Sequence, residues 1–190
     1  PSRLVAIVVP LSTRAELAPD EQVSLRHLRR HLGRYDRFLL APEGLDPGLD
    51  DFRVRWFPRR FFGSAAAHGR LLYWWRFYRA FADYEYIFFY HLDSLVFSDQ
   101  LEEWCRAGID YIGPPWIPCE DSPWVQEARV GNGGFTLLRV ASALKVLENR
   151  YRAERKAYWL DMFSRNARPW MVRVVERIGR AAPRMPVVRA

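Results

Sequence analysis

The chain has 190 residues, of which 49% are hydrophobic and 15% aromatic, and its formal net charge is +7. This composition excludes an intrinsically disordered protein, because such chains have little apolar surface to bury. No apolar run reaches the roughly 20 residues of a membrane-spanning helix. Residues 165–190 hold seven arginines and one acid, a balance of +6 that leaves only +1 for the preceding 164 residues. A nucleic-acid reader carries a basic face on its folded body, so the charge argues against one.

The first half of the chain alternates strand and helix patterns. A continuous β-branched run ended by proline predicts a buried strand over residues 4–10. Pro19 and the two acids after it are typical of a helix start, and an apolar stripe continues to Gly33. The remaining elements predicted in this half are strands over residues 37–41 and 54–57 and one aromatic-rich helix over residues 64–83.

The second half continues the alternation from a strongly apolar strand over residues 84–90. The elements predicted after it are a helix over 99–107, a strand over 111–112, a loop over 113–127, a strand over 135–138 and a helix from about 141. Strands that alternate with helices indicate an α/β domain with a mainly parallel sheet flanked by helices. We expect residues 1–150 to form this single domain. We expect residues 151–190 to form a basic helical extension packed on the same domain.

Asp93 is the first candidate functional residue, because it directly follows the apolar strand 84–90. Ligands of such sheets bind beyond the carboxyl ends of the strands, and hard divalent cations prefer oxygen ligands. The sequence therefore predicts that Asp93 contacts a ligand or a metal. The alternative is that Asp93 only caps a turn through Ser94 and Leu95.

A glycine-rich segment, Gly131-Asn132-Gly133-Gly134, is the second candidate. Glycine lets the backbone approach a ligand closely, and an asparagine side chain offers both a donor and an acceptor to sugar hydroxyls. The alternative is a plain turn that feeds the next strand. The segment lacks the spacing of a dinucleotide-binding fingerprint.

The segment His91-Leu-Asp-Ser-Leu-Val-Phe97 resembles the DxD segment of GT-A glycosyltransferases. Together with Asp110-Tyr-Ile-Gly-Pro-Pro-Trp116 and Gly131-Asn-Gly-Gly-Phe135, it also resembles a bacterial family of unassigned function whose members are usually regarded as such enzymes. The resemblance covers about residues 4–148 and implies a GT-A-like, Rossmann-like fold. It places Asp93 on the second acid of the DxD motif, which ligates the metal that holds the donor diphosphate. His91 replaces the first acid.

The resemblance implies roles for further residues. Asp93 and His91 would hold Mn²⁺ or Mg²⁺, although His91 could equally contact ribose or be an ordinary neutral histidine. Arg70 would neutralise a phosphate or remain a solvated arginine, and Trp116 would stack on a sugar or belong to the core. The implied donor-binding residues are Pro10, Leu11, Ser12, Thr13, Arg70, His91 and Asp93, and those on the sugar or acceptor side are Trp116, Gly131, Asn132, Gly133 and Gly134.

We therefore expect a glycosyltransferase of cell-envelope polysaccharide that moves a sugar from a nucleotide-diphosphate donor to a glycan or lipid-linked acceptor. The alternative is a non-catalytic nucleotide- or sugar-binding domain, because Glu154 and Asp161 do not resemble the acidic segment that supplies the base in inverting relatives. The expected location is the cytoplasm. The basic amphipathic residues 165–190 would either contact the inner membrane peripherally or pack on the domain.

Overall fold

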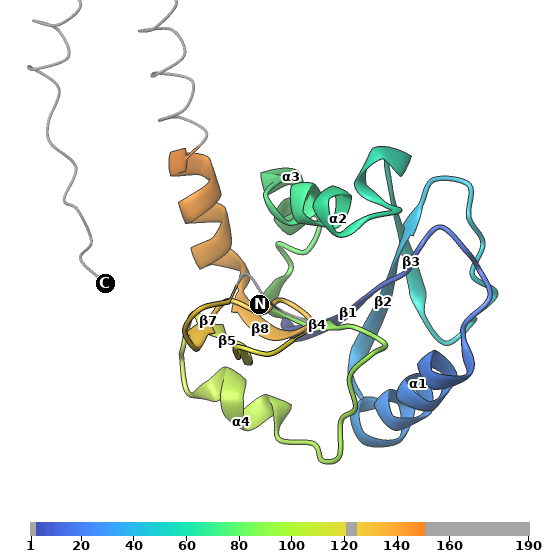
Figure 1. Cartoon of the computed structure of the whole chain (residues 1–190), viewed down its shortest axis with the longest axis horizontal. Helices are drawn as coiled ribbons and strands as arrows, with labels where there is room; N and C mark the ends of the chain where they lie inside the picture. The colour runs from blue at the N-terminus through green and yellow to red at the C-terminus, as the bar shows by residue number, and fades with distance from the viewer. Residues whose placement is uncertain (1–2, 121–124, 151–190) are drawn as a thin grey trace, which may run out of the picture. The chain divides into compact units, whose positions relative to one another are not determined.

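Six strands form one central sheet, in the order β3-β2-β1-β4-β8-β5 (Figure 1). The computed structural model describes residues 3–120 and 125–150, and the sheet belongs to a first unit, Pro1–Leu147, that is distinct from a second unit, Glu148–Ala190. The predictions for residues 151–190 lie outside the described residues. The strands are β1 (Arg3–Pro10), β2 (Asp36–Pro42), β3 (Arg53–Phe57), β4 (Tyr84–Tyr90), β5 (Tyr111–Ile112) and β8 (Phe135–Arg139).

Most neighbouring strands are parallel, which confirms the predicted α/β class with a mainly parallel sheet. β1 pairs in parallel with β2 on one side and with β4 on the other, and β2 pairs in parallel with β3. β8 runs antiparallel to both β4 and β5. β8 therefore starts beside the carboxyl end of β4, where Phe135 pairs with Tyr90.

Helices cover both faces of the sheet (Figure 1). On one face lie α1 (Pro19–Leu32) and α4 (Leu101–Arg106). On the other face lie η1 (Arg59–Phe61), α2 (Ala65–Leu72), α3 (Trp75–Arg79) and the helical residues 140–147 of this unit. In the described part of the chain, no helix has the length and hydropathy to cross a membrane.

The strands contribute side chains to two hydrophobic clusters, one on each face of the sheet, because successive side chains of a strand point to opposite faces. β4 sends Tyr86, Phe88 and Tyr90 to the α1/α4 face. It sends Ile87 and Phe89 to the α2/α3 face. Because β4 is buried on both faces, it reads as the continuous apolar run that identified it in the sequence.

The single helix predicted over residues 64–83 is wrong, because two short helices occupy this range. Trp74 interrupts them with an extended backbone, φ −93° and ψ 108°. Its ring stacks on Phe61 at 5.0 Å and meets the edge of Phe57 at 6.4 Å. Burying this large ring against η1 and β3 outweighs continued helical hydrogen bonding.

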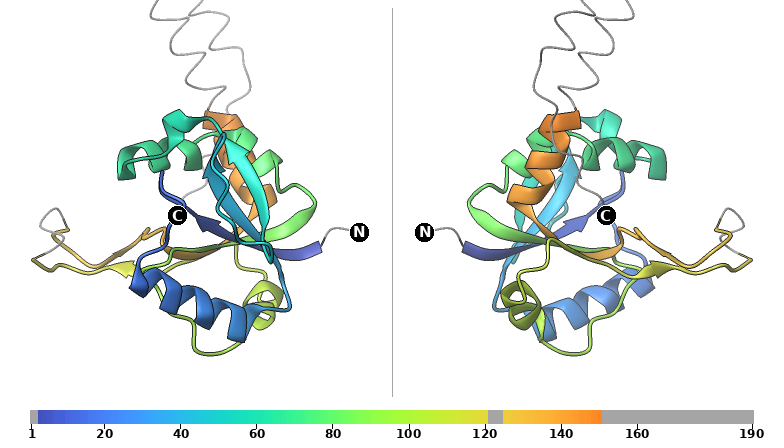
Figure 2. Two further views of the ribbon diagram at one scale, coloured as in Figure 1. Left: turned by 90° about the vertical axis from the view of Figure 1, so that its right-hand side faces the viewer. Right: turned by 90° about the vertical axis from the view of Figure 1, so that its left-hand side faces the viewer.

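The stretch predicted as a loop over residues 113–127 contains part of a two-stranded ribbon. β6 (Pro115–Trp116) pairs antiparallel with β7 (Arg129–Val130). The ribbon projects from the body of the unit (Figure 2). Both of its ends return to the sheet, at β5 and β8.

Candidate functional site

The switch point of the sheet lies between β1 and β4. From β1 the chain continues to β2 and β3 on one side, and it then crosses to β4 on the other side of β1. Ligands of open α/β sheets bind in the crevice outside the carboxyl ends of the strands at such a switch point. Pro10 ends β1 and residues 11–13 follow it, while residues 91–94 follow β4, and Val8 and Phe89 are register partners just before these ends. The fold therefore brings together the two strand ends that the sequence predicted for the donor.

The turn after β1 is only partly accessible. Leu11 is buried and its N–H donates to the carbonyl of Leu40 at 2.9 Å, so it belongs to the core. Ser12 and Thr13 are exposed. A Cβ added to Gly63 would lie 3.6 Å from Cγ2 of Thr13, which places the start of α2 beside this turn.

Asp93 lies in a tight turn whose position is fixed by buried hydroxyls. The Ser94 N–H donates to the His91 carbonyl at 3.0 Å. The Ser94 carbonyl lies 2.6 Å from the hydroxyl of Ser24 on α1 and 2.9 Å from that of Tyr90. The Asp93 side chain is exposed, and Oδ1 accepts from the Ser94 hydroxyl at 3.4 Å. The turn is thus anchored to the core while the Asp93 carboxylate faces outward.

The glycine-rich segment is hydrogen-bonded to the end of β4. The His91 N–H donates to the Gly134 carbonyl at 2.8 Å, and a Cβ on Gly134 would lie 3.5 Å from His91 Nδ1. Within the segment, Oδ1 of Asn132 accepts from the Gly134 N–H at 3.1 Å. The Asn132 side chain therefore shapes the turn, and the segment lies next to His91 at the end of β4.

A close backbone approach holds the segment against β5 and its following residues. The Asn132 carbonyl accepts from the hydroxyls of Thr136 at 2.7 Å and Tyr111 at 3.3 Å. A Cβ on Gly113 would lie 2.8 Å from Thr136 Oγ1, closer than real side chains allow. Gly113 is therefore required by packing, a role that its place in the sequence did not reveal.

Trp116 is half-buried on β6 and lies against the backbone of Gly131. A Cβ on Gly131 would be 3.9 Å from Cδ1 and Nε1 of the indole, and Gly131 has a positive φ of 137°. A side chain at residue 131 would be strained by this backbone, and its Cβ would be in ordinary contact with the indole. The structure thus joins Trp116 to the glycine-rich segment.

His68 of α2 was not among the predicted site residues, and its ring packs on that of His91. The two ring centroids are 5.3 Å apart in an edge-to-face arrangement. Burial and the nearby His91 lower the pKa of His68 to about 4, and burial also lowers the pKa of His91, partly offset by Asp93. Neither Nε2 atom has a hydrogen-bond partner among the described residues. The rings of His68 and His91 are therefore two neutral imidazoles in contact with each other, next to the Asp93 turn.

Arg70 does not reach this group through any of the contacts described above. Its guanidinium is exposed and donates to the carbonyl of Arg60 at 3.2 Å. Its predicted contact with a phosphate stays a prediction. Within residues 3–120 and 125–150, no group of three or more His, Cys, Asp or Glu side chains could hold a metal ion. A metal at Asp93 would need ligands from elsewhere.

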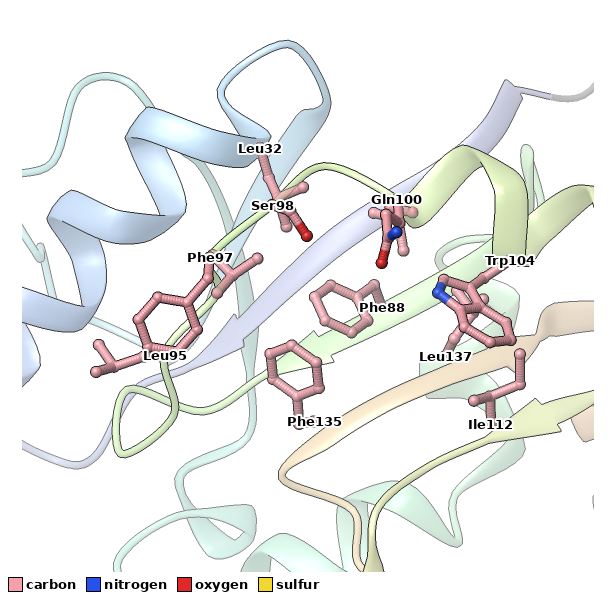
Figure 3. A pocket seen from close by; sticks show the side chains of 12 residues that line it. Leu32, Phe88, Leu95, Phe97, Ser98, Gln100, Trp104, Ile112, Phe135 and Leu137 are labelled. Atoms are coloured by element: carbon pink, nitrogen blue, oxygen red, sulfur yellow. The ribbon is translucent and has the colours of Figure 1, made fainter.

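A pocket of about 290 Å³ opens on the α1/α4 face, beside the Asp93 turn (Figure 3). Most of its lining side chains are apolar. They include Phe88, Leu95, Phe97, Trp104, Phe135 and Leu137. Ser98 and Gln100 are polar residues of its lining. The sequence did not reveal this pocket, because its walls come from segments far apart along the chain.

Residues 51–180 match the model of a family described as "Protein of unknown function (DUF5672)". The chain belongs to the DUF5672 family. No curated protein matches the chain. The expected membership in a family of unassigned function is thereby confirmed, and the likeness to glycosyltransferases stays a prediction.

The DUF5672 match contains β4, the Asp93 turn, the glycine-rich segment and every described residue of the ribbon. Residues 10–13 lie before the match. The candidate site therefore combines family residues with a turn that the first strand supplies. Its outward groups are one carboxylate, two hydroxyls and a glycine-rich backbone, which suit a polar, hydroxyl-bearing or phosphate-bearing ligand better than an apolar one.

Proposed function

We propose that this DUF5672 chain binds a nucleotide-diphosphate sugar at the carboxyl ends of β1 and β4 and transfers the sugar to a hydroxyl of a glycan or lipid-linked acceptor. The observation that carries the proposal is the outward Asp93 carboxylate at the switch point of the sheet. Its turn is anchored by Ser24 and Tyr90, and the glycine-rich segment is bonded to the adjacent His91. An outward carboxylate on an anchored turn, beside a glycine-rich backbone, suits a cation-bridged diphosphate.

The metal of this proposal is Mn²⁺ or Mg²⁺. Mg²⁺ is commonly held by one or two carboxylates together with substrate phosphates and water. A single carboxylate, Asp93, fits that pattern, and His91 fits less well because its Nε2 atom is buried. The metal would stabilise the negative charge that develops on the departing diphosphate.

The reaction forms a bond between the acceptor oxygen and the anomeric carbon. The bond from that carbon to the diphosphate oxygen breaks, and the diphosphate leaves with the electron pair. The acceptor hydroxyl loses its proton to a base. We assign no residue to that base, so donor binding is the better supported half of the proposal and a non-catalytic donor-binding domain is the alternative.

Thermal unfolding with nucleoside diphosphates and Mn²⁺ tests donor binding. A ligand that binds only the folded state at 100 times its Kd stabilises it by about 2.7 kcal/mol. We expect at least one diphosphate to raise the Tm of the wild type in the presence of Mn²⁺ and Asp93→Asn to abolish the rise. Asp83→Asn is the matched control, because Asp83 is an exposed aspartate at the opposite end of β4. A Tm unaffected by every diphosphate would contradict the proposal.

Donor turnover separates the enzyme from the binding domain. Release of nucleoside diphosphate from UDP- and GDP-sugars, measured with and without glycan acceptors, should require Asp93. Binding without turnover under all of these conditions would leave the alternative, a nucleotide- or sugar-binding domain.

A further inference from the structure

The pocket on the α1/α4 face has apolar side chains exposed around its mouth. Phe97 is 70% exposed, Trp104 50% and Leu95 43%. Figure 3 shows Phe97 and Trp104 on opposite sides of the pocket, with the rings of Phe88 and Phe135 between them. Exposed apolar groups that converge on a concavity mark a binding site rather than ordinary surface.

The pocket shares two segments with the candidate donor site. Leu95 and Phe97 follow Asp93 by two and four residues, and both line the pocket. Phe135 lines it too, directly after Gly134, whose carbonyl accepts from His91. An occupant of the pocket therefore contacts the same two loops that would hold the donor.

The size and chemistry of the pocket restrict its occupant. The volume of about 290 Å³ is close to the lower limit for small-molecule pockets, which is about 300 Å³. An α-helix of a partner needs a groove about 10 Å wide along its length. The walls offer aliphatic and aromatic contacts, with Ser98 and Gln100 as the polar groups of the lining. A single aliphatic chain meets these conditions, because it is narrow and needs no polar partner inside.

We propose that this pocket binds one aliphatic chain of a lipid and that the chain belongs to the acceptor. The second half of this statement rests on the proposed function, because it needs a donor at Asp93. It selects the lipid-linked class from the two acceptor classes. The lipid would be held next to the loop that carries the diphosphate, and its polar head would remain outside the apolar walls.

Binding of n-alkyl phosphates to the full chain, measured by isothermal titration calorimetry, tests the pocket. We use ethyl, hexyl, octyl and decyl phosphate below their micelle concentrations. Burial of each methylene contributes about 0.8 kcal/mol, or roughly fourfold in affinity, so affinity should rise steeply with chain length. Affinity that does not depend on chain length would overturn the proposal, because it would report the phosphate alone.

Two matched variants locate the binding. Leu95→Glu puts a charge in the mouth and should weaken decyl phosphate binding at least tenfold. Ile109→Glu changes an isomeric side chain of similar exposure, 46%, outside the pocket lining, and should leave the affinity within twofold. Equal affinity of the wild type and Leu95→Glu would overturn the proposal. A third result would also overturn it: a wild-type dimer that is dissociated by Leu95→Glu but not by decyl phosphate. The apolar face would then be a contact between two copies of the chain.

The acceptor half of the proposal has its own readout. If decyl phosphate binds but donor turnover stays unchanged by alkyl-chain acceptors, the pocket is not an acceptor site. If the wild type binds no nucleoside diphosphate, the proposed function is wrong, but the rise of alkyl phosphate affinity with chain length would still show that the pocket binds an aliphatic chain. The two failures are therefore distinguishable.

Discussion

The two faces of the central sheet are built from alternate residues of the same strands, yet they are packed differently. On the α2/α3 face, the ring of Phe77 lies within 5.7 Å of the rings of Phe57, Tyr78, Phe81 and Phe89. On the α1/α4 face, the Phe88 and Phe135 rings meet at 4.8 Å but also line an open pocket. Both faces therefore hold a buried cluster, but the cluster on the α1/α4 face also lines the pocket for which we propose a ligand.

The largest expected effect compares one phenylalanine from each face. Phe77 is fully buried, and Phe77→Ala should lower the free energy of unfolding by about 3–5 kcal/mol, through lost burial and a new cavity. Phe135 is half-buried and already lines a cavity, so Phe135→Ala should cost about 1–2 kcal/mol. Urea unfolding measures both. Equal losses would break the distinction between the faces.

A second comparison sets two glycines of the site against each other. Gly113→Ala would put Cβ within 3.1 Å of Thr136, Tyr111 and Asn132, and overpacking of this kind costs about 1–3 kcal/mol. Gly133 has no neighbour within 4 Å of its added Cβ, so Gly133→Ala should change stability by less than about 0.5 kcal/mol. The two unfolding curves in urea check this. A destabilised Gly133→Ala would mean that the glycine-rich segment is packed, not open.

The buried imidazoles predict a pH dependence. The unfolded chain protonates His68 near pH 6.5, whereas the folded chain does so near pH 4. Between these values the unfolded state binds more protons, so the contribution of His68 to stability is fully present above about pH 7 and is lost as the pH falls toward 4. Between pH 7 and 5 the loss is about 2 kcal/mol.

His68→Phe is the control for this pH dependence, because it keeps the ring and removes the titration. Its free energy of unfolding, measured in urea at pH 7 and pH 5, should change less than that of the wild type. Identical changes in the two proteins would show that the His68 ring is accessible to protons in the folded state.

The smallest expected effect concerns the anchor of the Asp93 turn. Ser24→Ala removes one of two hydroxyls at the Ser94 carbonyl and should cost about 1 kcal/mol, the typical value for a buried hydrogen bond. Ser142→Ala, which removes an exposed hydroxyl bonded to Asp110, is the control and should be nearly neutral. The diphosphate-induced rise in Tm should fall in Ser24→Ala and persist in Ser142→Ala.

The sequence was sufficient for features that depend on neighbours along the chain. The apolar run 84–90 identified β4, and the position of Asp93 after it placed the carboxylate at the correct edge of the sheet. Through the resemblance, the glycine-rich segment was predicted to lie on the sugar or acceptor side of the same site as Asp93. The bond from His91 to Gly134 supports that proximity.

Features that depend on distant segments were missed. The break at Trp74 arises from rings on η1 and β3, which helical periodicity does not register. His68 and His91 are 23 positions apart, and only the packing of α2 on the end of β4 brings their rings together. The apolar pocket was missed for the same reason, because its side chains look like ordinary core residues when read in order.

The reversed direction of β8 has a consequence for how the site could vary. β5 leaves the sheet at the edge where β8 returns, and Ile112 and Leu137 are register partners. The chain therefore leaves the sheet after Ile112 and re-enters it at Phe135, on the strand that pairs with the one it left. An exchange of residues 113–134 between family members would replace Trp116, the ribbon and the glycine-rich segment together, without altering a strand of the central sheet. The part of the site that we propose meets the sugar would then change as a unit, while the Asp93 turn is held by Ser24 and Tyr90 of the core.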